Sequence, residues 1–269
     1  MTRVPTGSPR CLYPLTFGWE AISVSVSLKG GSPDEYLLEP VTGAAVVYDD
    51  AWVLIDTGFN VDTIRDQQKR LAHYIWESYA PLITTGDPLL HQVDACGLRW
   101  ADLAFCAISH LHCDHSGGLH HLVGGPPIVM QQREYEFALS DAGLQHAYFR
   151  TDYEIEGLTW SLVDGEEELA PGLIALPTFG HTPGHMSFAI SLPSGKTVVL
   201  ACDAADLRRN IDLAIPCGTT THPGLEEAAA QSIQQLRTLD QRSDTEVWPG
   251  HDPDFWPTRS PTQPPHPVR

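Results

Sequence analysis

Four residues able to bind a metal ion fall within six consecutive positions, in the segment His110-x-His112-x-Asp114-His115. The segment follows a short apolar run, 104–109, which predicts a β-strand. A loop at a strand end can turn alternate side chains toward one point, and Gly117 and Gly118 would let the chain turn sharply afterwards. Imidazoles with a carboxylate suit zinc better than magnesium or calcium, which prefer oxygen ligands. We therefore predict a transition-metal site here.

Three further candidate ligands come from later segments, each next to an apolar stretch. They are His185 in the turn His181-Thr-Pro-Gly-His185, Asp203 at the end of 197–203, and His251 in Pro-Gly-His. Taken singly, such a residue is more often a cap or a surface residue. In this order, and together with the first cluster, they indicate a shared site, because α/β sheets place their chemistry at the carboxyl ends of strands.

The elements that must position these residues are short strands interrupted by helices. We predict strands within 44–56 (two, around an Asp-Asp turn), 104–109, 126–132, 158–164, 172–178, 186–192, 197–203 and 245–252, the last ending at His251. We predict helices over 61–79, 133–141 and 224–239, and a surface crossing over 80–98. Each half of the chain has strands followed by a helix, which predicts two sheets packed face to face with helices outside. We expect a single domain over 1–269, with a loose leader at 1–10 and a Pro-rich, poorly ordered tail at 256–269.

Composition narrows the classes of partner. The formal net charge is -18, which disfavours nucleic acid and anionic membranes, because both are bound through Lys and Arg. Six cysteines without a C-x-x-C pair fit a reducing compartment. No secretory h-region or 18-residue apolar run is visible, so we expect a cytoplasmic protein without a membrane span. A homodimer is an open alternative for the oligomeric state.

The order H-x-H-x-D-H, P-G-H, strand-end Asp and G-H-D resembles the metallo-β-lactamase superfamily, and so does Asp56-Thr57-Gly58. The resemblance covers about residues 40–255. It implies an α/β fold, a four-layer αβ/βα sandwich of two mixed sheets, with two metal ions between the halves. The iron-using branch has a carboxylate at the position of His112, so the resemblance favours two zinc ions, for which manganese or cobalt could substitute.

The resemblance also implies a role for each ligand. One metal ion would be bound by His110, His112 and His185, and the other by Asp114, His115 and His251. Asp203 would bridge both ions together with a water-derived hydroxide, and Asp114 would accept or relay a proton, so both aspartates are candidate catalytic residues. His181 would only stabilise its loop, and Asp56 would orient a ligand histidine or act as a turn residue.

Within the superfamily, the chain resembles the N-acyl-homoserine lactone lactonases. Three other branches of the superfamily fit less well. Secreted β-lactamases carry export signals, and thioesterases of the glyoxalase II type add a helical region after the last ligand. The tRNA-processing branch needs a basic surface, whereas this chain is acidic. The segments QQREYEFAL, LAPGLIALPTFGHTPGH and CDAAD followed by IPCG look like those of the lactonases. The resemblance implies hydrolytic opening of a lactone. The alternatives are another lactone, ester or phosphoester hydrolase of this fold, and a metal-stabilised protein without catalysis.

Two positions depart from the lactonase pattern. Asp206 stands where these enzymes commonly have a tyrosine that contacts the substrate carbonyl, and Cys113 stands where many have a bulky aromatic. The conceivable replacements for that tyrosine are Tyr148, Tyr153 and His222. Candidate residues for an apolar groove that takes an acyl chain are Phe17, Trp19, Tyr148, Phe149 and Met186.

Overall fold

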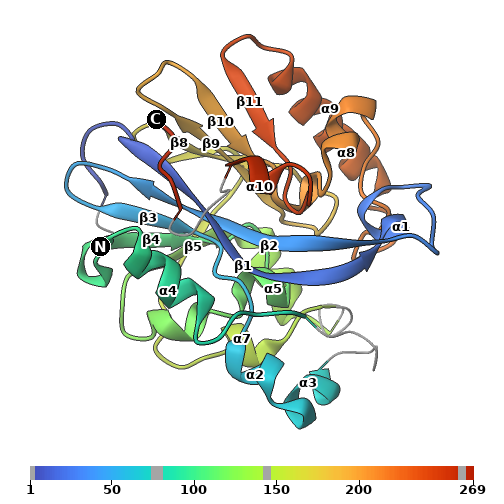
Figure 1. The fold of residues 1–269 in the computed structure, drawn as a ribbon, viewed down its shortest axis with the longest axis horizontal. Helices are drawn as coiled ribbons and strands as arrows, with labels where there is room; N and C mark the ends of the chain where they lie inside the picture. The colour runs from blue at the N-terminus through green and yellow to red at the C-terminus, as the bar shows by residue number, and fades with distance from the viewer. Residues whose placement is uncertain (1–3, 74–80, 142–146, 260–264) are drawn as a thin grey trace.

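Two mixed β-sheets form the centre of the computed structural model, which describes residues 4–73, 81–141, 147–259 and 265–269 (Figure 1). The first sheet has the strand order β1-β2-β3-β4-β5-β6, and the second β11-β10-β9-β8-β7. The strands of the first sheet are Cys11–Ser23, Tyr36–Val47, Trp52–Ile55, Leu103–Ala107, Ile128–Gln131 and Trp160–Val163 (β1 to β6). Those of the second are Glu167–Ala170, Leu173–Pro177, Met186–Ser191, Thr197–Leu200 and Thr245–Trp248 (β7 to β11).

The direction of the strands brings several of their carboxyl ends to one edge. In the first sheet β3, β4, β5 and β6 run parallel, after the antiparallel pairs β1–β2 and β2–β3. In the second sheet β10 and β11 are parallel, and β8 runs in the same direction because both β8 and β10 are antiparallel to β9. The loops that follow β8, β10 and β11 therefore leave the second sheet on the same side.

Helices cover the outer faces of the sheets, as Figure 1 shows for α8 and α9 beside β11. Their bounds are Val24–Ser27, Val61–Arg65, Gln67–His73, Pro88–Ala95, Cys113–Ser116, Gln132–Leu139, Arg150–Tyr153, Arg208–Leu213, Glu226–Asp240 and Trp256–Arg259 (α1 to α10). Helix α4 packs on β1, α6 on β5 and α9 on β11. The predicted architecture, two mixed sheets with helices outside, is confirmed.

The central strands of the first sheet are buried on both faces. All residues of β3, β4 and β5 are buried, as expected for the central strands of a parallel sheet covered on both sides. Val53 and Phe105 from the first sheet and Phe188 from the second belong to one continuous apolar cluster. The two sheets therefore share a core, which fixes the loops at their edge relative to one another.

Two predicted elements differ from the structure because an aspartate caps the start of a helix in each. The helix predicted over 61–79 is broken at Asp66, whose backbone is extended and whose carboxylate accepts from Gln68 N and Lys69 N, starting α3. The residues from 74 to 80 lie outside the described ones. The segment 80–98, predicted as a surface crossing, contains α4, because Asp87 caps its first turn and Leu89 is buried.

Described parts of both chain ends form backbone hydrogen bonds with the first sheet, and two strands differ from the prediction. Arg10 N donates to Val47 O at 2.7 Å, so the described part of the leader is tied to β2. In the tail, Val268 forms a two-way backbone bridge with Leu12, at 2.8 and 2.9 Å. Strands β1 and β7 were not predicted. Within the described residues, no helix has both the length and the apolar character that a membrane crossing requires.

Candidate metal centre

The predicted ligand segments converge at the edge where β4, β8, β10 and β11 end. The first motif follows β4, with Asp114 and His115 on the single turn of α5. Gly117 and Gly118 have negative φ, a backbone conformation that any residue can adopt. Glycine is required at these positions because other backbone segments approach them closely, not because the chain turns there. A methyl group on Gly117 would lie 2.0 Å from Asn60 N. The glycines thus let the ligand loop pack directly on the loop after β3.

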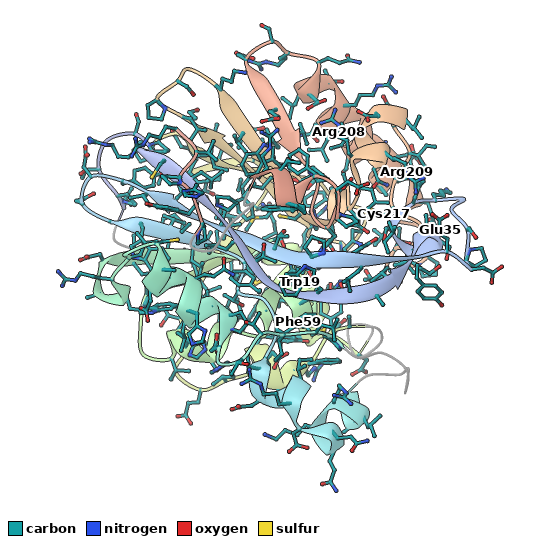
Figure 2. The ribbon with its side chains drawn as sticks, viewed as in Figure 1. Trp19, Glu35, Phe59, Arg208, Arg209 and Cys217 are labelled. Carbon is teal, nitrogen blue, oxygen red and sulfur yellow. The ribbon has the colours of Figure 1, made fainter. Side chains whose placement is uncertain are left out.

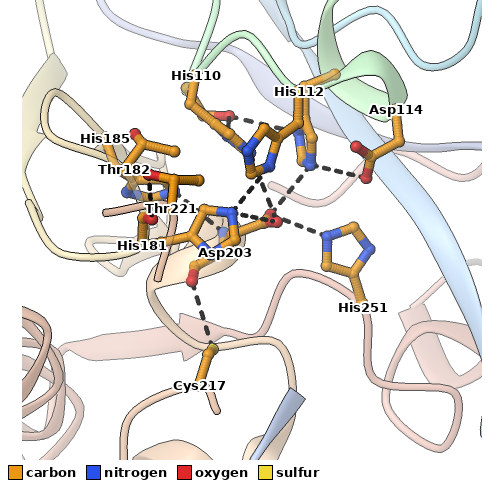
Figure 3. A network of polar contacts seen from close by, with 12 residues as sticks. His110, His112, Asp114, His181, Thr182, His185, Asp203, Cys217, Thr221 and His251 are labelled. Carbon is orange, nitrogen blue, oxygen red and sulfur yellow. Dashed lines mark hydrogen bonds and ion pairs between the residues drawn. The ribbon is translucent and has the colours of Figure 1, made fainter. Parts of the chain in front are cut away.

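Asp203 lies at the centre of the converging side chains (Figure 3). Its Oδ1 lies 3.0 Å from His115 Nε2 and 2.9 Å from His251 Nε2. Its Oδ2 faces another set, 3.6 Å from His110 Nε2 and 3.3 Å from His181 Nε2. One carboxylate therefore presents a separate oxygen to each of two groups of nitrogen donors.

The donor atoms form two compact groups that share Asp203. In each group the atoms lie within 4.8 Å of one another; the groups are His110, His112, His181 and Asp203, and Asp114, His115, Asp203 and His251. In the first, His181 Nε2 lies 3.0 Å from His112 Nδ1. In the second, Asp114 Oδ2 lies 3.1 Å from His115 Nε2. Six of the seven predicted ligands are brought together in this way.

His185, the seventh predicted ligand, is not part of either group. Its Nε2 accepts a hydrogen bond from Asp203 N at 3.1 Å, and its Nδ1 contacts Thr178 Oγ1 at 2.9 Å. Both ring nitrogens are therefore engaged, and the ring holds the backbone of Asp203 in place. The neighbouring His181, which was not among the predicted ligands, belongs to the first donor group.

His181 and His185 are held by different parts of the fold, a difference that the sequence does not display. His185 immediately precedes β9 and is tied to the sheet, because its carbonyl accepts from Thr178 N. His181 lies four residues past the end of β8, in the loop that bends over Asp203. Two histidines four positions apart look alike in sequence, and only the point at which β9 begins separates them.

The ring nitrogens that face away from Asp203 are held by neighbouring groups. His115 Nδ1 contacts Asp56 Oδ2 at 2.9 Å, His251 Nδ1 contacts Pro40 O at 2.9 Å, and His110 Nδ1 contacts Ser109 Oγ at 3.0 Å. Asp56, at a φ of 56° after β3, also accepts from Ser109 N at 2.8 Å. Such contacts orient metal-binding imidazoles, so the geometry supports the role expected for Asp56.

Burial and charge put several donors in the form that binds cations. Burial lowers the pKa of His110, His112 and His181, and neighbouring histidines add to the effect. Burial alone would raise the pKa of Asp203, but His115 and His251 hold it well below its usual range. In the first group, neutral imidazoles thus face an ionised carboxylate. In the second group, burial would lower the pKa of His115 and His251, but the nearby carboxylates outweigh it and raise both.

The buried polar atoms test whether a cation fits. Among the described residues, His110 Nε2 and His115 Nε2 are buried without a hydrogen-bond partner, although both point at Asp203. A buried unpartnered nitrogen is costly in a folded protein. A divalent cation on each side of Asp203 would satisfy these two atoms, so the residues fit the metal centre that their types predicted.

Glu134 ties the two ligand loops together, a role that the sequence did not suggest. This fully buried residue of α6 accepts from Leu111 N at 3.1 Å in the first motif and from Gly184 N at 3.1 Å in the His181–His185 loop. Thr182 Oγ1 at 2.6 Å and Tyr148 Oη at 2.5 Å also donate to it. The one hint of this role in the sequence is that Glu134 lies in QQREYEFAL, a segment that resembles the corresponding segment of the lactonases.

None of the three candidate replacements for the missing tyrosine is available as a donor to the centre. Tyr148 Oη donates to Glu134, Tyr153 Oη donates to Ala138 O at 3.0 Å, and His222 is exposed. Asp206 itself is buried, and its Oδ1 has no hydrogen-bond partner among the described residues. Burial and then the charge of Asp203 raise the pKa of Asp206 well above its usual range, so the carboxyl group at this position can be protonated and can both accept and donate.

The candidate groove residues are mostly core residues. Phe17, Tyr148, Phe149 and Met186 are buried, and so is Cys113 on α5. Trp19 on β1 is half-buried and is labelled in Figure 2. Of the five candidates, only Trp19 keeps a surface that an acyl chain could contact.

Comparison with known proteins agrees with the fold and the site. The family model for the metallo-beta-lactamase superfamily matches residues 39–242, three quarters of the chain. The chain therefore belongs to the metallo-β-lactamase superfamily, and it is a metal-dependent hydrolase of that fold with a divalent-metal centre.

Within that class, the similar proteins are lactonases. The chain is 30% identical to the N-acyl homoserine lactonase AttM of Azorhizobium caulinodans, over 92% of this chain and 95% of that protein. It is 27% identical to the N-acyl homoserine lactonase AiiA of Bacillus thuringiensis subsp. kurstaki, over 82% and 84%. The crystal structure of a B. thuringiensis AiiA mutant with N-decanoyl-L-homoserine bound at the active site superposes with a TM-score of 0.81 at 25% identity, covering 94% of this chain and 97% of that chain.

Proposed function

We propose that the centre binds two zinc ions that share Asp203. The first would be held by His110, His112, His181 and Asp203 Oδ2, and the second by Asp114, His115, His251 and Asp203 Oδ1. Imidazole and carboxylate ligands suit zinc, and manganese or cobalt could replace zinc at the same ligands. The observation that carries this assignment is the division of the two Asp203 oxygens between two groups of nitrogens.

The reaction that we propose is the hydrolytic opening of a lactone ring, with N-acyl homoserine lactones as the substrate class. It is supported by the similarity to AttM and AiiA along most of the chain. An N-acyl homoserine lactone hydrolase with N-hexanoyl-L-homoserine at its catalytic metal centre superposes with a TM-score of 0.81 at 25% identity, covering 94% of this chain and 97% of that chain.

The residues of the chain would divide the work of this hydrolysis. When bound, two zinc ions supply a lowered pKa for water and polarisation of a carbonyl oxygen. Water adds to the lactone carbonyl carbon, the ring C–O bond breaks, and the product is a hydroxy acid. Asp114, whose Oδ2 lies 3.1 Å from His115 Nε2, would take the proton from the water and return it to the ring oxygen. Asp203 would keep both groups of donors in register.

Asp206 would bind the substrate differently from a tyrosine. It adjoins the centre, because its carbonyl accepts from His251 N at 2.8 Å. Its unpartnered Oδ1 can accept a hydrogen bond, and the amide N–H of an N-acyl homoserine lactone is a donor. We therefore expect Asp206→Ala to raise KM more for an N-acyl homoserine lactone than for an unsubstituted γ-lactone.

The test is turnover by zinc-loaded protein, with the ring-opened acid quantified by chromatography and the metal content measured on the same sample. We expect two zinc ions per chain and hydrolysis of N-acyl homoserine lactones. The variant Asp203→Asn should lose zinc binding and hydrolysis alike. Matched Asp212→Asn, an exposed aspartate of α8, should behave as the parent. Absence of turnover on N-acyl homoserine, γ- and δ-lactones at full zinc loading would refute the substrate class.

A second candidate keeps the centre and changes the substrate. Asp206 at the tyrosine position favours esters or other lactones that carry a hydrogen-bond donor. Phosphoesters are less suited, because a chain with a net charge of -18 repels anions at a distance. Aryl ester and phosphodiester substrates in the same assay distinguish these reactions.

A further inference from the structure

A second cluster of metal-binding side chains lies outside the centre described above. Its members are Asp87, His120 and His121, and one ligand atom from each lies within 4.8 Å of the others. Asp87 precedes α4, whereas both histidines belong to the 3-10 helix Leu119–Leu122 (η2). All three residues are partly buried and still reach solvent. The cluster therefore joins two segments that are far apart in the chain.

The possible ligand atoms of these side chains face one another, and a bound ion would replace the hydrogen bond between His121 and Asp87. His121 Nε2 lies 2.9 Å from Asp87 Oδ2, and the two histidine rings have centroids 3.9 Å apart. His120 Nδ1 contacts Gly117 O at 3.0 Å, so this nitrogen carries the proton and Nε2 keeps its lone pair. A backbone carbonyl that fixes the tautomer in this way is the usual partner of a metal-binding histidine.

Asp87 is held in place independently of the histidines. Its Oδ1 accepts from Leu89 N at 3.0 Å and Leu90 N at 3.3 Å, capping α4. Its Oδ2 is thereby directed at the histidines. The side chain is only 20% exposed, and that of His121 21%. A simple His–Asp ion pair would explain two of these residues, but not the adjoining His120 with its fixed tautomer.

We propose that Asp87, His120 and His121 form a third, peripheral site for a transition-metal ion, with zinc as the ion that its donors suit best. Two imidazole nitrogens and one carboxylate oxygen are the donor types of open zinc sites, in which water completes the coordination. The protonation states agree with this assignment: burial and then His121 lower the pKa of His120, and the His121 contact and the α4 N–H groups outweigh burial to lower that of Asp87.

Occupancy would brace the loop that follows the first ligand motif. The ion would link η2 to the start of α4, and His120 contacts Gly117, two residues beyond His115. Because three partly exposed donors bind less tightly than the buried groups, the third ion should bind last. The site would make the stability of this loop respond to zinc beyond what the hydrolytic centre needs.

The experiment counts zinc on full-length protein. Protein equilibrated against excess zinc is compared with the variants His120→Ala and His121→Ala by metal analysis at defined free zinc and by calorimetric titration. We expect the parent to bind one equivalent more than either variant. Zinc added beyond the amount that fills the hydrolytic centre should raise the Tm of the parent but not that of His120→Ala or His121→Ala. His91→Ala, which removes an exposed histidine of α4 outside the cluster, should keep the extra equivalent.

Two results would overturn the proposal: a parent that binds no more zinc than the variants, or loss of the same equivalent in His91→Ala, which would mean nonspecific surface binding. The difference between parent and variant does not depend on how many ions the hydrolytic centre holds. Failure of the proposed function would instead appear as absent turnover with an unchanged difference in zinc.

Discussion

Replacing Asp56 with asparagine tests whether a residue that touches no proposed metal ion controls metal binding. The Asp56 carboxylate accepts from Ser109 N with Oδ1 at 2.8 Å and from Ser109 Oγ and His115 Nδ1 with Oδ2, both at 2.9 Å. An asparagine has one acceptor and one donor in the same shape. Whichever way its amide faces, an NH₂ group meets Ser109 N–H or the protonated Nδ1 of His115.

The size of the effect follows from that forced donor–donor contact. Asp56 is 1% exposed, so water cannot relieve the contact, and a buried unsatisfied donor costs about 1–3 kcal/mol. His115 can escape only by moving its proton to Nε2, the nitrogen that lies 3.0 Å from Asp203 Oδ1. We expect a roughly 10–100-fold loss of zinc affinity in the His115 group, as is typical for such partners.

The assay is competition for zinc against a chromophoric chelator, with one affinity resolved for each group of donors. Asp56→Asn should weaken the step assigned to Asp114, His115 and His251 and leave the other nearly unchanged. Asp62→Asn, which removes an exposed carboxylate on α2, is the matched control. Parent-like affinities in both steps for Asp56→Asn would refute the reasoning, and equal weakening of both steps would mean that the whole site is displaced.

Four further outcomes follow from single contacts. Glu134→Gln should lower the free energy of unfolding in urea by about 2–4 kcal/mol, because one amide oxygen cannot accept the four hydrogen bonds of the carboxylate; Tyr148→Phe, which removes one of them, should cost less. Gly117→Ala should cost about 3 kcal/mol, because the added methyl would lie 2.0 Å from a backbone nitrogen; an equal cost for Gly125→Ala, at 3.2 Å, would contradict this. Burial raises the pKa of Asp152 to about 7, above its unfolded value, so the native state binds the extra proton and stability falls as pH rises from about 4 to 7. Asp152→Asn should remove up to about 4 kcal/mol of this fall in the free energy of unfolding, measured for the variant and the parent at each pH. A variant with the same pH profile as the parent would show that Asp152 does not cause the fall. His185→Ala should lower turnover while the protein still binds two zinc ions in metal analysis, since its Nε2 holds Asp203 N rather than an ion; loss of one equivalent would return it to the ligand set.

The sequence predicted the elements whose pattern is local. The strands β3, β4, β5, β8, β9 and β10 are short apolar runs between turn residues, and α9 has a periodic apolar face, so each could be placed without tertiary information. Strand β1 could not, because its pairing with β2 spans a long hairpin and its burial depends on α4. The break at Asp66 was also missed, because a carboxylate that caps a new helix looks like any polar residue on a helix surface.

The site was predictable to the extent that its ligands share one segment. His110, His112, Asp114 and His115 are fixed by their spacing after β4, whereas the choice between His181 and His185 depends on where β9 begins. Glu134 shows the limit more clearly. Its four donors come from three separate segments, and no spacing along the chain reveals that one carboxylate accepts from all of them.

Stability and chemistry are joined in this centre, because its members come from both sheets. Asp203 belongs to the second half of the chain, and it faces His110 and His115 from the first half. Bringing an ionised carboxylate and several imidazoles out of water is costly unless opposite charge is supplied. Apolar contacts hold the sheets together below the site, but they cannot offset unpartnered nitrogens at its edge. Cations bound between the two halves would remove that cost and at the same time fix the donors that the proposed hydrolysis requires, so the same contacts would complete the fold and define the reaction.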